Sequence, residues 1–386
     1  MKHKTKIFFR TTLLILLLGI TGIIGINKLF NTEYSSLSNM DKSMIKQLSQ
    51  IYETYNNNSG EIWKEGYNFN NIPLVLTPVS KDRGMLHAYS YIVGVDKLVN
   101  PILSKRIEVP KEMNLPPIYR VSFLSPSLFK TWLPINFTFS DIGTQHVTLF
   151  KYNPSNATNM NTEKSFKYFL MHEVFHEYRQ VPLWKNVDKL SSSILIDKRN
   201  KDQYQLLLLE CSILDKANEI SNRDELINVL SDYVTAREYR YNKFPDMKQE
   251  KQVETLEGCA QYIEYGYANL VGDTVKPPLT VNGEVVEFKD IFTKETLENF
   301  VKGSGLNGFM DKNLYYYVGS LEGVLLDKLH INWKDRVESN ELIYDVMKDE
   351  IYKLSNGKVD NINEIKNKYD YNNFRDEVEI IINNLS

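Results

Sequence analysis

Residues 169–179 read Phe-Leu-Met-His-Glu-Val-Phe-His-Glu-Tyr-Arg, and the interpretation of the whole chain starts from this stretch. His172 and His176 are four positions apart, so on a helix they share one face and can direct two imidazole rings at one metal ion. Glu173 is rotated by about 100° from His172, which suits a general base acting on a metal-bound water. The apolar neighbours imply a buried helix, with Thr162 as its expected N-cap. The stretch therefore predicts a helix that binds Zn²⁺.

The third ligand must come from elsewhere, because a catalytic zinc ion normally takes three protein ligands and a water molecule. The best candidate is Glu257, which opens the sequence Glu-Gly-Cys-Ala-Gln-Tyr-Ile-Glu at residues 257–264. Its small neighbours allow one helix backbone to approach another closely. Glu254 and Glu264 share a helical face with Glu257, so either can orient a histidine ring through a hydrogen bond.

Glu210 is an alternative ligand, embedded in the apolar run Leu-Leu-Leu-Leu-Glu-Cys-Ser-Ile-Leu. A carboxylate in such a run needs a partner. Arg237 and Arg240 offer one, and we expect Glu210 to form a buried ion pair or to support a ligand.

These two segments together resemble the gluzincin class of zinc metallopeptidases, whose pattern is HExxH followed by a distal EGxAxY. The resemblance covers about residues 160–330. It implies that His172, His176 and Glu257 bind zinc and that Glu173 is the catalytic base. The separation between His176 and Glu257 is 81 residues, which is longer than in the best-known members.

The same class implies a tyrosine that stabilises the oxyanion formed at the attacked carbonyl. The sequence Asn-Leu-Tyr-Tyr-Tyr-Val-Gly at 313–319 offers three adjacent candidates. Tyr316 matches the expected spacing from a following glycine best, Tyr317 is next, and Tyr315 is also open. The class further implies that an extended substrate pairs with an edge strand, for which residues 145–152 are our candidate.

The pattern of elements predicts an α+β fold of the zincin type. We expect a helix at residues 38–56, followed by strands at 72–79, 86–95, 118–123, 135–141 and 145–152. Helices fill residues 162–270, Asn282-Gly283 marks a hairpin, and helices resume from 293. We therefore expect an N-terminal segment at 1–30, a strand-rich lobe with a mixed sheet at 31–160, and a mainly helical zinc-binding lobe at 161–386.

The N-terminal segment predicts the compartment. Lys2, Lys4, Lys6 and Arg10 precede the uncharged run of residues 11–26. An uncleaved single-pass anchor is our first interpretation and a cleaved signal peptide the second, with a poor cleavage candidate at 36–38. In both, the positive flank stays in the cytoplasm and the main body lies outside it, in a secreted form if the segment is cleaved.

Composition narrows the function classes. The chain of 386 residues has 46 basic and 49 acidic side chains, a balance that argues against a nucleic-acid partner. Cys211 and Cys259 are the two cysteines, so a cysteine-rich metal site is excluded. They either pair or remain separate buried thiols.

The sequence thus predicts a membrane-anchored extracytoplasmic zinc metallopeptidase that acts on peptides or proteins. Zn²⁺, one per chain, is the expected cofactor, and Glu173 activates its water. The alternative is a non-enzymatic surface protein in which the metal site is structural.

Overall fold

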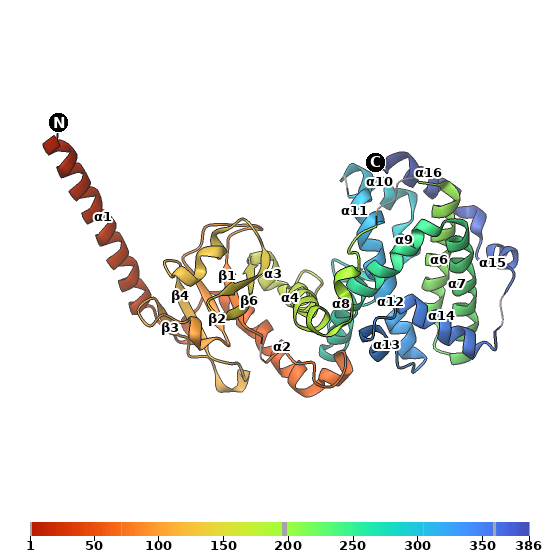
Figure 1. Ribbon diagram of the computed structural model, residues 1–386, viewed down its shortest axis with the longest axis horizontal. Coiled ribbons are helices and arrows are strands. Elements are labelled where there is room, and N and C mark those ends of the chain that lie inside the picture. The colour runs from red at the N-terminus through yellow and green to blue at the C-terminus, as the bar shows by residue number, and fades with distance from the viewer. Residues whose placement is uncertain (1, 71, 195–198, 304, 358–359, 386) are drawn as a thin grey trace. The chain divides into compact units, whose positions relative to one another are not determined.

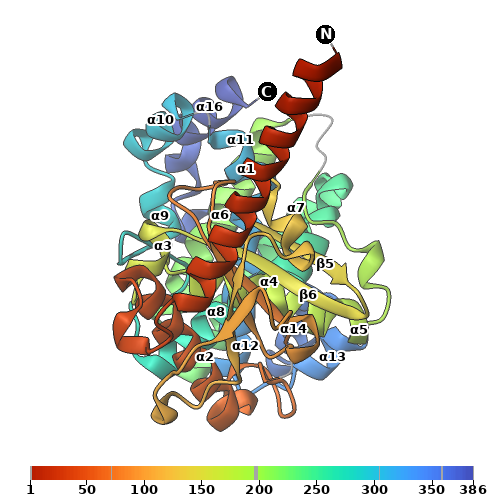
Figure 2. The same cartoon turned by 90° about the vertical axis from the view of Figure 1, so that its left-hand side faces the viewer.

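The computed structural model describes residues 2–70, 72–194, 199–303, 305–357 and 360–385 (Figures 1 and 2). The chain forms two compact units. The first, which we call the sheet unit, comprises Met1–Gly60, Glu65–Met160 and Lys164–Leu170. The second, the helical unit, comprises Glu61–Lys64, Asn161–Glu163 and Met171–Ser386. A mixed sheet followed by a mainly helical region confirms the α+β prediction.

The sheet unit contains six strands and most of the N-terminal helices. Its helices are α1 (Lys2–Leu29), α2 (Asn39–Ile62, which ends in the helical unit), α3 (Pro154–Thr158) and the start of α4 (Phe166–Phe175). Its strands are β1 (Leu74–Pro78), β2 (Tyr89–Val93), β3 (Ser104–Arg106), β4 (Ile118–Ser122), β5 (Phe137–Ile142) and β6 (Gln145–Tyr152). Five of these strands fall on the predicted ranges. The short polar β3 has no apolar alternation and was not predicted.

The strands form one mixed sheet in the order β3-β4-β2-β1-β6-β5. β1 pairs with β6 in parallel, Leu74 opposite Thr148, and the other neighbours are antiparallel. The prediction that β6 is an edge strand is therefore wrong, because β1 and β5 flank it. Six consecutive residues of β6 are buried, as expected for an internal strand. The edges of the sheet are β3 and β5.

The predicted N-cap of the helix that carries His172 is also corrected. α4 begins at Phe166, so Thr162 lies outside it. The hydroxyl of Ser165 instead accepts a hydrogen bond from the backbone N–H of Lys167 at 3.4 Å. Ser and Thr have the same capping chemistry, and the sequence alone did not separate the two positions.

The helical unit is built around long helices that pack side by side. Its elements are the last turns of α4, then α5 (Val181–Leu183), α6 (Lys201–Glu219), α7 (Arg223–Lys243), α8 (Glu250–Val271), β7 (Leu279–Val281), β8 (Glu284–Val286), α9 (Phe288–Ile291), α10 (Lys294–Lys302), α11 (Leu306–Gly308), α12 (Leu314–Lys328), α13 (Lys334–Glu338), α14 (Ile343–Leu354), α15 (Ile362–Lys368) and α16 (Arg375–Asn384). The hairpin β7–β8 turns at Asn282 and Gly283, which both have positive φ, as predicted.

Two glycines bring α8 and α12 into backbone contact. A Cβ atom on Gly258 would lie 2.7 Å from the Cα atom of Gly319, and one on Gly319 would lie 2.2 Å from the carbonyl oxygen of Glu254. Neither position accepts a larger residue without separating the helices. The contact holds the start of α12 against the middle of α8, beside Glu257.

A buried ionic network lies behind this contact. Its members are Glu210, Arg237, Arg240, Glu250, Glu254 and Glu322. Arg240 binds both oxygens of Glu210, at 2.6 and 2.8 Å, and both oxygens of Glu250, at 2.8 and 2.6 Å. Arg237 binds Glu254, and also Glu322 at 3.1 Å. Four carboxylates face two guanidinium groups, so two negative charges would be left over if all four were ionised.

The excess of carboxylates over guanidinium groups in this network predicts that the stability of the folded chain falls as pH rises. Burial raises the pKa of Glu254 to about 7, more than Arg237 lowers it, because one carboxylate oxygen is buried without a hydrogen-bond partner. Between its ordinary pKa of 4.5 and about 7, the folded chain holds a proton that the unfolded chain has lost. Within this range, each rise of one pH unit therefore lowers the free energy of unfolding by about 1.4 kcal/mol per such proton.

Denaturant unfolding from pH 5 to 8 checks this expectation. Glu254→Gln keeps a neutral side chain, so we expect the pH slope of its unfolding free energy to be shallower by one proton. Exposed Glu298 on α10 gives the control variant Glu298→Gln, which should behave as the wild type. An unchanged slope in Glu254→Gln would contradict a protonated Glu254.

The N-terminal helix has the properties of a membrane span or a signal sequence. The segment Phe9–Leu29 of α1 is long and apolar enough to cross a membrane, and no residue of its most apolar stretch is buried. Cys211 and Cys259 are both free and buried, so they are separate thiols.

Candidate metal centre

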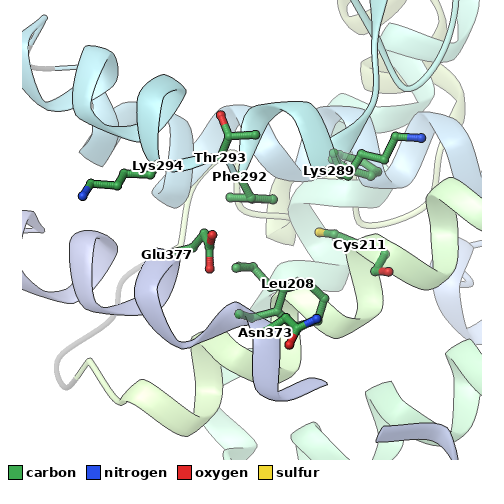
Figure 3. Close-up of a pocket in the computed structure, with 11 residues that line it drawn as sticks. Leu208, Cys211, Lys289, Phe292, Thr293, Lys294, Asn373 and Glu377 are labelled. Carbon is green, nitrogen blue, oxygen red and sulfur yellow. The ribbon is translucent and has the colours of Figure 1, made fainter. Parts of the chain in front are cut away.

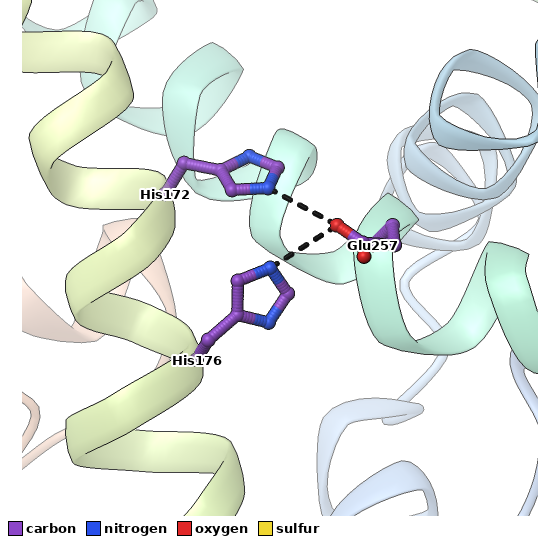
Figure 4. A group of neighbouring side chains, drawn as sticks. All are labelled: His172, His176 and Glu257. Carbon is purple, nitrogen blue, oxygen red and sulfur yellow. Dashed lines mark hydrogen bonds and ion pairs between the residues drawn. The ribbon is translucent and has the colours of Figure 1, made fainter. Parts of the chain in front are cut away.

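Two helices of the chain direct three ligand atoms at one point. His172 lies on α4, and His176 begins the π-helical turn His176–Gln180 that continues it. The Nε2 atoms of the two rings lie 3.3 and 3.2 Å from the same oxygen, Oε2 of Glu257 on α8 (Figure 4). The three ligand atoms lie within 4.8 Å of one another. The histidine pair and the distal glutamate of the sequence are thus brought together.

These distances fit a metal ion. Two ligand atoms, each 2.0–2.1 Å from a tetrahedral zinc ion, are about 3.3 Å apart. The two nitrogen–oxygen separations of 3.3 and 3.2 Å have this length. His172 and Glu257 are buried and His176 is half-buried, so the group is sheltered and still reachable.

The other ring nitrogens fix the tautomers. Nδ1 of His172 lies 2.9 Å from Oε1 of Glu264, and Nδ1 of His176 contacts Oε1 of Gln180. The Gln180 amide is oriented by its own N–H₂, which donates to the carbonyl of Leu256 at 2.7 Å. Both Nδ1 atoms therefore face acceptors and carry the protons. Each Nε2 atom is left with a lone pair pointing at Glu257, as in metal-binding histidines.

Two lone pairs and a carboxylate cannot face one another without a cation between them. That cation is either a metal ion or a proton. Burial disfavours the His172 cation, but hydrogen bonds to Glu257 and Glu264 outweigh burial and raise the pKa of His172 to about 10. Burial likewise opposes ionisation of Glu257, yet hydrogen bonds to the two histidines lower its pKa well below the usual range. The donor set of two imidazoles and one carboxylate fits Zn²⁺.

Gln180 was not predicted from the sequence. It is fully buried, and the wide π-helical turn brings its amide back onto His176, four residues earlier. π-helical turns occur often at functional sites, but the residues 176–180 carry no sequence signature of one. The i, i+4 spacing to His176 was the signal available.

The hydrogen bonds of Glu264 and Gln180 with the two histidines predict that replacing either residue weakens metal binding. Removing a hydrogen-bond partner of a metal-binding histidine typically costs 10–100-fold in affinity. We therefore expect Glu264→Gln and Gln180→Ala each to weaken zinc binding by about 10–100-fold, measured by competition with a fluorescent chelator. Exposed Asn269 lies further along α8, and Asn269→Ala should bind as the wild type does. Equal affinities for all four proteins would contradict the assigned roles.

Two further predicted residues lie at the rim of this group. Glu173 is half-buried, and its charge contributes to the raised pKa values of both His172 and Tyr316. The Tyr316 ring stacks on that of His172, with centroids 5.8 Å apart and an interplanar angle of 18°. Burial, followed by the charge of Glu257, raises the pKa of Tyr316 well above its usual value. Tyr316 therefore keeps its proton and remains a hydrogen-bond donor.

The neighbouring tyrosines have different surroundings. The Tyr315 hydroxyl donates to Glu250 at 3.2 Å, within the buried ionic network. Burial, with the charges of Glu264 and Glu163, raises the pKa of Tyr317 to about 12. Of the three candidates, Tyr316 is the one whose ring lies against a histidine of the group.

The other candidate carboxylates belong to the ionic network. Glu210 is held by Arg240 and Glu254 by Arg237. Neither is part of the group formed by His172, His176 and Glu257. The ion pair expected for Glu210 is present, and Glu264 rather than Glu254 orients a histidine.

A cavity of about 270 Å³ lies apart from these ligands (Figure 3). The residues that line it include Leu208 and Cys211 of α6, Phe292 directly after α9, and Glu377 of α16. Burial raises the pKa of the Cys211 thiol well above its usual value, so the cavity presents no reactive thiolate. None of its lining residues is a candidate metal ligand.

Comparisons with models of protein families, with curated proteins and with solved structures found no match to this chain. The site must therefore be interpreted from its own geometry and chemistry.

Proposed function

We propose that this chain is a zinc-dependent peptidase of the HExxH type that works outside the cytoplasm. The observation that carries the proposal is the convergence of His172, His176 and Glu257, with Glu173 on the turn beside them. Residues with these roles occur together in the gluzincin pattern that the sequence resembles. The apolar segment of α1, with basic residues at the start of the helix, directs the rest of the chain across the membrane.

The residues divide the chemistry among them. A bound Zn²⁺ ion supplies a Lewis acid that lowers the pKa of water toward neutrality. The Glu173 carboxylate accepts the proton of the attacking water and passes it to the leaving amine. The Tyr316 hydroxyl donates a hydrogen bond to the carbonyl oxygen as that oxygen gains negative charge. Glu264 and Gln180 keep the two imidazole rings in the binding orientation.

A purely structural metal site is the second candidate. Structural zinc sites usually have four protein ligands and no open position. Among the residues that the structure describes, the group has three such ligands. The stacked Tyr316 and the half-buried Glu173 at its rim also have no role in a structural site.

Metal analysis and peptide cleavage test the proposal together. The purified full chain should contain one zinc ion and should cleave members of a peptide library. A chelator should remove this activity, and added zinc should restore it. Bound zinc without cleavage of any peptide would favour the structural site.

Tyr316 gives a specific prediction for the chemistry. Loss of one oxyanion donor typically lowers kcat by about 10²–10³-fold, so we expect a fall of this size in Tyr316→Phe with the zinc content unchanged. Tyr352 is exposed on α14, and Tyr352→Phe is the matched control. Wild-type turnover in Tyr316→Phe would remove the tyrosine from the mechanism.

A further inference from the structure

The end of α1 is built into the sheet unit. Asn27, the third-last residue of α1, is 3% exposed. Its side-chain oxygen accepts a hydrogen bond from Arg120 of β4 at 2.7 Å. The Lys28 ammonium donates to the carbonyl of Ser104 in β3 at 3.4 Å and also to that of Pro101. The guanidinium of Arg120 lies 4.0 Å from the centroid of the Phe30 ring, directly after the helix. Figure 1 shows α1 reaching the sheet beside these two strands.

The contacts also give the direction in which α1 leaves. Beyond β3, Tyr34 N–H donates to the carbonyl of Glu108 at 3.1 Å. Lys105, within β3, donates to the carbonyl of Phe30 at 2.7 Å. Before β3, Pro101 receives the Lys28 ammonium. Residue 34 thus lies near the C-terminal end of β3, and residues 28–30 lie near its N-terminal end. α1 therefore leaves the sheet at the N-terminal end of β3.

The strand register shows which loops share that end of the sheet. Ser104 is opposite Val121 of β4, Ser122 is opposite Tyr89 of β2, and β1 and β6 both end there. The loops at this end are residues 79–88, 99–103 and 123–136, and the segment that contains α3 also begins here, after β6.

Outside α1, these loops carry most of the exposed large apolar side chains of the sheet unit. The side chains are Met85 (46% exposed), Leu86 (84%), Ile102 (61%), Phe129 (70%), Leu133 (42%) and Ile135 (44%). In the described part of the sheet unit, Phe169 on α4 is the one other large apolar residue outside α1 that is exposed. A set of this kind on one end of a unit marks an interaction surface.

The loops are held together rather than free. The buried Lys151 ammonium donates to the carbonyl of Gly84 at 2.8 Å and also to that of Leu133. The rings of His87 and Trp132 lie 4.3 Å apart. The apolar side chains are therefore presented on one supported surface.

We propose that this end of the sheet unit rests on an anionic lipid bilayer and that α1 is retained as the anchor that holds it there. Of the 21 residues of Phe9–Leu29, the 18 that precede Asn27 span about 27 Å at 1.5 Å per residue, which is close to the thickness of the hydrocarbon core. They leave the sheet at the same end as the exposed apolar loops, with no linker between. The loops also carry Lys81, Arg83 and Lys130 against one acid, Asp82, which suits anionic headgroups. Cleavage at residues 36–38 would remove Asn27 and Phe30, which contact Arg120 and Lys105.

Site-specific labelling of the full chain in vesicles tests this proposal. A fluorophore is attached to Leu86→Cys or Phe129→Cys, in vesicles of anionic phospholipid that contain a lipid-borne quencher. The matched control is Glu112→Cys, because Glu112 is exposed in the loop between β3 and β4 at the opposite end. We expect strong quenching at the first two positions and little at the third. Quenching should weaken when the anionic lipid is replaced by a zwitterionic one.

Equal quenching at all three positions would overturn the proposal that this end rests on a lipid bilayer. Cross-linking between copies through Leu86→Cys, without quenching, would also overturn it, because it would show that a second copy of the chain covers this surface. The intact mass of membrane-extracted chain should include α1, and an N-terminus beyond Leu29 would overturn the retained anchor. All three substituted residues are exposed, and unchanged thermal melts verify that the variants fold. None of these results depends on the metal site.

Discussion

Glu173→Gln is expected to lose nearly all peptidase turnover while it binds zinc as the wild type does. Glutamine has nearly the shape of glutamate but cannot take up the proton of the attacking water. General acid–base catalysis contributes about 10²–10⁴-fold, so kcat should fall by about this factor. Zinc binding should persist because Glu173 is not part of the His172, His176 and Glu257 group.

Turnover of a cleaved peptide and zinc content by mass spectrometry check this prediction on the same sample. Glu177 lies one turn further along the helical segment, and Glu177→Gln is the matched control that should keep its activity. Substantial turnover in Glu173→Gln would refute the assigned base. Loss of zinc together with activity would instead mean that Glu173 supports the metal.

Glu257→Gln should have the largest effect on the metal itself. The neutral amide lacks the charge that Glu257 directs at both histidines, at 3.3 and 3.2 Å. We expect a loss of zinc affinity greater than the 10–100-fold typical of outer hydrogen-bond partners. Glu264→Gln, which changes such a partner, gives the intermediate step of the series.

Thermal and denaturant unfolding with added zinc provide a measurement that needs no substrate. A ligand at 100 times its Kd stabilises the folded chain by about 2.7 kcal/mol. The wild type should show this gain, and Glu257→Gln should show almost none at the same zinc concentration. A full gain in Glu257→Gln would mean that another residue supplies the third ligand.

The two groups of buried carboxylates in the helical unit show why burial alone does not identify a ligand. Glu210, Glu254 and Glu257 are all buried. Glu210 and Glu254 are paired with arginines, whereas the partners of Glu257 are two imidazole nitrogens. The type of partner, imidazole or guanidinium, therefore separates the candidate ligand Glu257 from Glu210 and Glu254.

Local geometry made several features predictable. A helix places residues four apart on one face, so the pairing of His172 with His176 followed from spacing alone. The turn at Asn282 and Gly283 has positive φ at both residues, and these two residue types predict such a turn. The strands with apolar alternation were predicted for the same reason, and β3, which lacks it, was missed.

The sequence by itself therefore determined the helix that carries the pair His172 and His176, the α+β class and the apolar N-terminal segment, because each depends on neighbours within a few turns of chain. Tertiary packing alone decided the position of β6 inside the sheet, the choice of Glu264 as the partner of His172, and the closure of Gln180 onto His176. Glu264 lies 92 residues from His172, and the backbone contact at Gly258 and Gly319 fixes how α8 lies. Such contacts arise from the shapes of packed helices, which no local pattern of residues encodes.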